Sequence, residues 1–148
     1  MRGNDIEKQA LCFHWFGHLF ILNELEREGN LNSSLKKCDN ISSDFKLNCY
    51  DGIFMEHHFK DTSSEHGLAQ LPNFTSDYIH SLQQNCLSYN GTFGVGCWME
   101  IAGVAIKAYG TMNPEKIYEE CNKAPTEEEK DICYIKVAVL LPIEAVLS

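Results

Sequence analysis

The sequence predicts an all-α fold in which disulfide bonds clamp helical hairpins. Three observations support this fold class: cysteines paired at a nearly constant spacing, a repeated pattern around the second cysteine, and helix-start residues in register. The chain has 148 residues and seven cysteines. Six of the cysteines form pairs with separations of eleven, eleven and twelve positions: Cys38–Cys49, Cys86–Cys97 and Cys121–Cys133.

The residues after the second cysteine of each pair repeat. The segments CYDGI, CWMEI and CYIKV begin at Cys49, Cys97 and Cys133, and each has an aromatic residue next and a β-branched residue four positions along. The segment CFHWF at Cys12 is a fourth copy. The copies are 37, 48 and 36 positions apart, and a period of about 36 built from helix pairs is typical of an α-solenoid-like array.

Residues that commonly cap helix starts stand seven positions before each second cysteine: Asp5, Ser42, Asn90 and Thr126. Thr126 and Glu129 also fit the reciprocal capping box. Gly110 suits a helix end, and Pro114 suits the first position of the next helix. We therefore expect about seven helices: long ones over residues 6–28, 43–59, 91–109 and 127–146, and shorter ones over 33–39, 76–87 and 114–122.

The length of the chain is typical of a single domain. We expect one all-α repeat domain over residues 1–148, with repeat units at 1–29 (a partial unit), 30–60, 73–110 and 111–148. The longer middle interval is explained by an insertion at 60–72, whose composition is that of a loop.

The paired cysteines predict three disulfides, each stabilising the fold by about 2.5–3 kcal/mol in the chain-entropy model. Disulfides persist in oxidising compartments, so we expect a secreted, periplasmic or cell-surface protein. Zinc–thiolate ligation is the alternative, but it usually involves close C-x(2–4)-C pairs, which this chain lacks. The twin C-x(9)-C hairpin of the mitochondrial intermembrane space has two cysteines on each helix, whereas each helix here has one.

Four N-x-S/T sequons, at Asn32, Asn40, Asn73 and Asn90, agree with an exported glycoprotein. Clustering of Ser, Thr and Asn at helix caps and loops is the alternative explanation, and Asn90 belongs to both sets.

Charge and hydropathy limit the partners. The net charge of −9 would repel the phosphate backbone of nucleic acids, so DNA or RNA binding is not expected. The run VAVLLPI is far shorter than the ~20 apolar residues of a membrane-spanning helix. We expect the chain to bind another protein or to self-associate.

Cys12 has no predicted partner, because the repeat places that partner at or before residue 1. Three explanations remain open: a trimmed piece of a longer exported precursor, a free thiol, or a contact through Cys12 with another chain. We favour the trimmed precursor, since Asp5 keeps the repeat's cap while the preceding short helix is missing.

The segments CFHWFGH and CYDGIFME resemble those of a group of uncharacterised cysteine-rich bacterial and archaeal proteins, in which C-x-H-G-x-G-H and C-Y-x-G-x-F-M-E recur. The resemblance covers Cys12 to Glu56, and it departs from the pattern at Trp15, where the group has glycine. It implies that the repeat and the histidines matter, and it implies no particular activity.

The residues that differ between the four copies of the repeat indicate a candidate metal site. Two and six positions after the second cysteine, the last two copies have apolar residues or glycine, whereas the first has His14 and His18 and the second has Asp51 at the earlier position. Residues four apart stack on one helix face. If neighbouring long helices pack in register, these three side chains approach one another and can hold a divalent metal such as zinc, copper or iron.

The alternative for the two histidines is a hydrogen-bonded structural pair, since histidine is often partly buried. Glu56, His57 and His58 are interpreted as a solvated helix end. No catalytic residues are assigned, because the H-E-x-x-H order and a nucleophile triad are both absent. The sequence thus favours a disulfide-stabilised binding, interaction or structural module over an enzyme, with a metal-binding protein or metal-dependent enzyme as the alternative.

Overall fold

The computed structural model describes residues 2–27 and 29–147, and it is all-helical across them. Within these ranges there are eight α-helices and one 3-10 helix, and no strand. Three disulfides join the cysteine pairs predicted from the spacing, with Cα–Cα distances of 5.9, 5.5 and 5.5 Å. The predicted fold class is therefore confirmed, whereas the solenoid-like stacking of the repeats remains a prediction.

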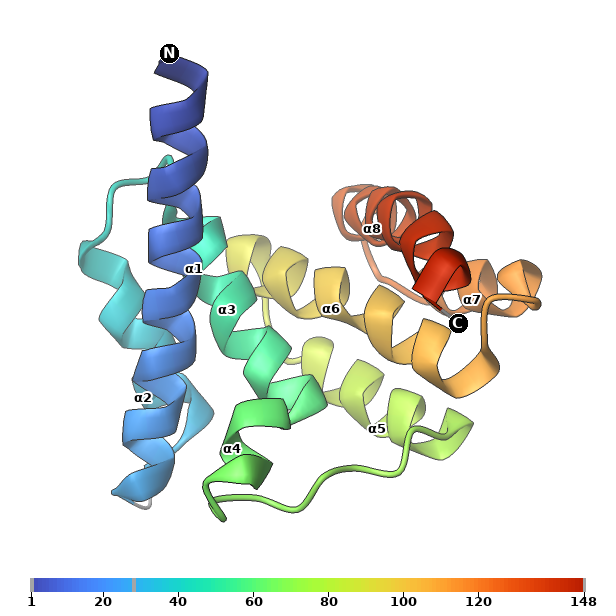
Figure 1. Ribbon diagram of the computed structural model, residues 1–148, viewed down its shortest axis with the longest axis horizontal. Coiled ribbons are helices and arrows are strands. Elements are labelled where there is room, and N and C mark those ends of the chain that lie inside the picture. The colour runs from blue at the N-terminus through green and yellow to red at the C-terminus, as the bar shows by residue number, and fades with distance from the viewer. Residues whose placement is uncertain (1, 28, 148) are drawn as a thin grey trace. The chain divides into compact units, whose positions relative to one another are not determined.

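The chain divides into two compact units, Met1–Leu71 and Pro72–Ser148, and each is described by itself. The first contains α1 (Arg2–Glu26), α2 (Leu31–Lys37), η1 (Cys38–Asn40), α3 (Lys46–Phe59) and α4 (Asp61–Glu65). The second contains α5 (Ser76–Cys86), α6 (Gly91–Tyr109), α7 (Pro114–Cys121) and α8 (Glu127–Leu147). Both units pair two long helices and use shorter ones to support them (Figure 1).

In the first unit, α1 lies against α3 at very short range. A methyl group built on Gly17 would overlap the backbone carbonyl oxygen of Cys49, and one built on Gly52 would overlap that of His14. Both glycines are therefore needed because backbone meets backbone where the helices cross. This contact fixes which residues of α1 and α3 face each other.

The disulfide between Cys38 and Cys49 ties the end of the short helix segment to the first turn of α3, and both cysteines are fully buried. The hydroxyl of Tyr50 donates a hydrogen bond to Asp39, 3.1 Å away, which reinforces the same junction. Cys12 on α1 is a free, exposed thiol. The first unit thus has one clamped and one unclamped long helix.

In the second unit, one disulfide joins α5 to α6 and another joins α7 to α8. Its core is mainly apolar and includes the fully buried residues Ile79, Trp98, Ile101, Val104, Ile117 and Val137. Both long helices of this unit are clamped.

The predicted helix starts were confirmed in part. The capping box is present, since Glu129 N–H donates to Thr126 Oγ1 and the Glu129 carboxylate accepts from Thr126 N–H, each at 3.2 Å. Asn90 occupies the N-cap position of α6 without a side-chain cap bond.

Two predicted caps were wrong. Asp5 lies within the first turn of α1, where the same acidic residue type is favoured by the helix dipole. The backbone carbonyl of Ser42 accepts from Phe45 and Lys46, so a turn precedes α3 and the helix begins later than expected.

The insertion at 60–72 is not entirely a loop, because it begins with the short helix α4. Lys60 ends α3 in a left-handed conformation with φ of 57°, which turns the chain directly into α4. Within the described residues, no helix is both long and apolar enough to cross a membrane.

Candidate metal site

Four side chains from α1 and α3 form two histidine–carboxylate contacts. His14 and His18 are one turn apart on the face of α1 that meets α3. His14 Nδ1 lies 3.3 Å from Asp51 Oδ2, and His18 Nδ1 lies 3.4 Å from Glu56 Oε1. The close crossing at Gly17 and Gly52 brings these pairs together.

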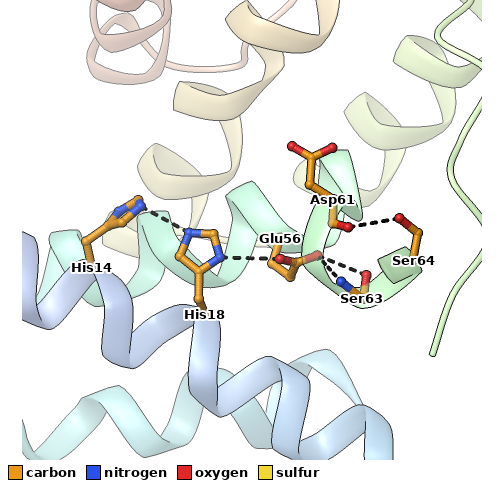
Figure 2. A network of polar contacts seen from close by, with 6 residues as sticks. All are labelled: His14, His18, Glu56, Asp61, Ser63 and Ser64. Carbon is orange, nitrogen blue, oxygen red and sulfur yellow. Dashed lines mark hydrogen bonds and ion pairs between the residues drawn. The ribbon is translucent and has the colours of Figure 1, made fainter. Parts of the chain in front are cut away.

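The two imidazole rings also face each other. The Nε2 atoms of His14 and His18 are 3.1 Å apart, and the ring centroids are 4.8 Å apart. Each histidine therefore has a carboxylate on its Nδ1 side and the other imidazole on its Nε2 side. Figure 2 shows the continuous row from His14 through His18 to Glu56 and Ser63.

Glu56 links this row to α4. Glu56 is only 2% exposed, and its Oε2 accepts hydrogen bonds from the Ser63 amide and hydroxyl at 3.0 and 2.9 Å. Burial opposes ionisation of this carboxyl, but the hydrogen bonds from His18, Ser63 and Thr62 outweigh it and lower the pKa to about 2. Glu56 is thus a buried carboxylate held ionised by its contacts.

The structure brings His14, His18 and Asp51 close together, with Asp51 beside the first histidine. Its carboxylate is next to Nδ1 of His14, whereas the two Nε2 atoms face each other. Among the described residues, His14, His18 and Asp51 do not bring three ligand atoms within 4.8 Å of one another. In this geometry Asp51 orients a histidine.

The interpretation of Glu56, His57 and His58 as a solvated helix end was wrong. Glu56 and His58 are buried. Burial, with a smaller contribution from the positive charge of Lys60, lowers the pKa of His57 to about 4 and disfavours the imidazolium form. For Glu56 the cause is α4, whose Ser63 amide and hydroxyl bond its carboxylate, and nothing in the composition of the insertion indicated it.

A pocket with a volume of about 250 Å³ lies beside the histidines. Its walls come from α1, α3 and α4, and the residues that line it are Leu11, His14, Trp15, His18, Met55, Glu56, Phe59, Asp61 and Thr62. Asp51 is not among them. The pocket makes the imidazole pair reachable by a small ligand, although His18 itself is only 7% exposed.

The described part of the second unit has no equivalent of this site. The positions that correspond to His14 and Asp51 are Met99 and Ile135, which offer no imidazole or carboxylate. Its buried carboxylate Glu120 accepts from Gln83 and Tyr109 at 2.7 and 3.0 Å. Burial, together with the hydrogen bond to Glu120, raises the pKa of Tyr109 to about 12. These polar groups satisfy one another, as structural groups do.

No model of a known protein family, no curated protein and no solved structure matches the chain. A function must therefore be inferred from the geometry and chemistry of the residues. They define an all-helical, disulfide-clamped protein with a paired-histidine site.

Proposed function

We propose that this protein binds a divalent transition metal through the Nε2 atoms of His14 and His18, with Asp51 and Glu56 as outer carboxylates. The observation that supports the proposal is the 3.1 Å separation of two Nε2 atoms whose rings each have a carboxylate on the opposite nitrogen. Carboxylate–histidine–metal arrangements of this kind fix the tautomer and the orientation of the ligating ring.

The protonation states explain why a cation fits between the rings. An ionised carboxylate only accepts hydrogen bonds, so it favours the tautomer in which Nδ1 carries the proton. Both Nε2 lone pairs then point into the same space and repel each other. One proton shared as N–H···N removes the repulsion, and so does one metal ion bound to both nitrogens.

The distance suits a metal. Two bonds of about 2.05 Å that enclose an angle of about 100° give the observed separation of 3.1 Å, and such bond lengths are those of zinc–imidazole sites. Imidazole ligands favour zinc, copper, nickel or iron over calcium and magnesium. The remaining coordination positions would be filled by solvent or a ligand from the pocket.

Metal analysis of the oxidised chain tests the proposal. We expect one equivalent of bound zinc or copper after dialysis, retained by a His80→Ala control and lost in His14→Ala and His18→Ala. His80 is an exposed histidine on α5 and serves as a matched control. Equal metal content in all four proteins, or none in the wild type, would leave the proton-shared structural pair as the explanation.

A second candidate function is an interaction module, which exposed apolar residues favour. Leu11, Trp15 and Leu19 on α1 follow one another at intervals of four, and all three are more than half exposed. Ile135, Val139 and Ile143 repeat the pattern on α8. Contiguous exposed apolar patches are typical of protein-binding surfaces.

Sedimentation velocity over a wide concentration range tests self-association, with Leu19→Lys and Ile143→Lys as variants. We expect a concentration-dependent increase in sedimentation coefficient that one of the variants abolishes. A Cys12→Ser variant separates association through the exposed thiol from association through the apolar residues.

We propose an oxidising, extracytoplasmic location for either function. Three disulfides support it. The side chains of Asn32, Asn40, Asn73 and Asn90 are all exposed, as glycan acceptors must be. Expression through a eukaryotic secretory pathway, followed by enzymatic removal of N-glycans, would reduce the apparent mass; an unchanged mass would remove the glycoprotein assignment.

A further inference from the structure

The pocket beside the histidines is larger than a metal ion requires. At roughly 30 Å³ of liquid volume for each water molecule, about 250 Å³ corresponds to about eight waters. Apolar side chains supply much of its wall, from Leu11 and Trp15 on α1 and from Met55 and Phe59 on α3. A space of this size and lining suits a small organic molecule.

The charges around the pocket favour a positive ligand. Two carboxylates line it, Glu56 and Asp61, and among the described residues no lysine or arginine does. The formal charge of the whole chain is −9, which raises the local concentration of cations further.

The carboxylates of Glu56 and Asp61 differ in whether they are free to bind a ligand. Both oxygens of Glu56 are engaged, one with His18 and the other with Ser63. Asp61 is bonded to Ser64 through its backbone carbonyl, which accepts from the Ser64 hydroxyl at 2.9 Å, and not through its carboxylate. Its carboxylate is exposed and points away from Ser64 (Figure 2), so it can pair with a ligand.

An aromatic face stands on the α1 side of the same pocket. The indole of Trp15 is 55% exposed, and its ring centroid lies 5.1 Å from that of His18. Tryptophan is the best aromatic partner for a cation placed over its ring face. A carboxylate and an indole that line one apolar pocket are the groups that recognise an organic ammonium.

We propose that this pocket binds a small organic amine in its protonated form, with the ammonium held by Asp61 and Trp15 and the apolar body placed against Met55 and Phe59. Binding of the amine uses the side chains that line the pocket and does not require a bound metal. It therefore goes beyond the proposed metal binding and is tested without metal.

The test uses benzylammonium as the probe and benzyl alcohol as its neutral counterpart, added to the ¹⁵N-labelled oxidised chain in the presence of a chelator at neutral pH. We expect saturable amide shifts around the pocket with benzylammonium, and binding roughly fivefold weaker or more with benzyl alcohol. Asp61→Asn and Trp15→Leu should each weaken benzylammonium binding by a similar factor. Glu65→Gln, an exposed charge change on the same short helix, should leave it unchanged.

Three results would overturn the proposal: no saturable shifts with benzylammonium, equal affinity for benzyl alcohol, or an equal effect of Asp61→Asn and Glu65→Gln. A negative result with benzylammonium would not contradict the proposed metal binding, because the chelator removes the metal from this experiment. Conversely, loss of metal in His14→Ala does not bear on benzylammonium binding.

Discussion

Gly52 of α3 lies directly against the backbone carbonyl of His14 on α1, with no space for a methyl group between them. The same contact that packs the two helices therefore sets the position of the first histidine of the candidate site. Both the stability of the first unit and the geometry of the histidine pair therefore depend on Gly52.

Gly52→Ala should lower the free energy of unfolding by about 1–3 kcal/mol, because overpacking forces the helices apart. It should also weaken metal binding, since His14 moves away from Asp51. Urea denaturation measures the first effect and zinc titration the second. Gly3→Ala is the control, since a methyl group there meets nothing within 4 Å; equal midpoints for the two variants would contradict the close crossing.

Removal of a single disulfide should be more costly than removal of the free thiol. Replacing Cys86 and Cys97 together by alanine should lower the free energy of unfolding by about 2.5–3 kcal/mol, the value for a loop of this length in the chain-entropy model. Cys12→Ser should leave it within about 0.5 kcal/mol, because that side chain is exposed and unpaired. Denaturant unfolding of the oxidised proteins distinguishes the two, and equal losses would argue that Cys12 has a structural role.

The covalent framework could be predicted from the sequence because it repeats. Three cysteine pairs with separations of 11, 11 and 12 positions, and with flanking residues of the same type, leave little freedom for other pairings. The capping box at Thr126 and Glu129 was predictable because its two partners are three residues apart in the sequence. Local chemistry of this kind is readable without tertiary structure.

The rest depended on tertiary contacts. Asp is favoured both at the N-cap and in the first turn of a helix, so Asp5 led to a predicted helix start that is too late in the sequence. Burial of Glu56 follows from α4 folding back over α3, and its bond to Ser63 spans seven positions through a left-handed lysine. The glycines at 17 and 52, close in sequence to His14 and Asp51, were the available signal for a close crossing.

Glu56 should make the stability of the first unit depend on acidity. Its pKa is about 2 in the folded protein, below the ordinary value of 4.5, so its contribution is full above about pH 4.5 and is lost as the pH falls towards 2. The difference in free energy of unfolding between the wild type and Glu56→Gln should therefore shrink over that range. Urea denaturation at a series of pH values measures it.

Glu65→Gln is the matched control for that experiment, because Glu65 is exposed on α4. Its difference from the wild type should stay nearly constant between pH 4.5 and 2. A constant difference for Glu56→Gln as well would mean that the contacts with His18 and Ser63 do not favour the ionised form.

Asp51→Asn separates an orienting carboxylate from a metal ligand. The amide oxygen of asparagine can still accept a hydrogen bond from His14 Nδ1, so a positioning role predicts a zinc affinity roughly 10-fold to 100-fold weaker, with one equivalent still bound. Asp51→Ala should fall at the weaker end of that range, because it leaves Nδ1 without its acceptor. Competition with a chromogenic chelator gives both affinities. If Asp51→Asn instead abolishes binding as completely as His14→Ala does, the carboxylate is a direct ligand, and α1 and α3 must shift on metal binding to bring it to the Nε2 side.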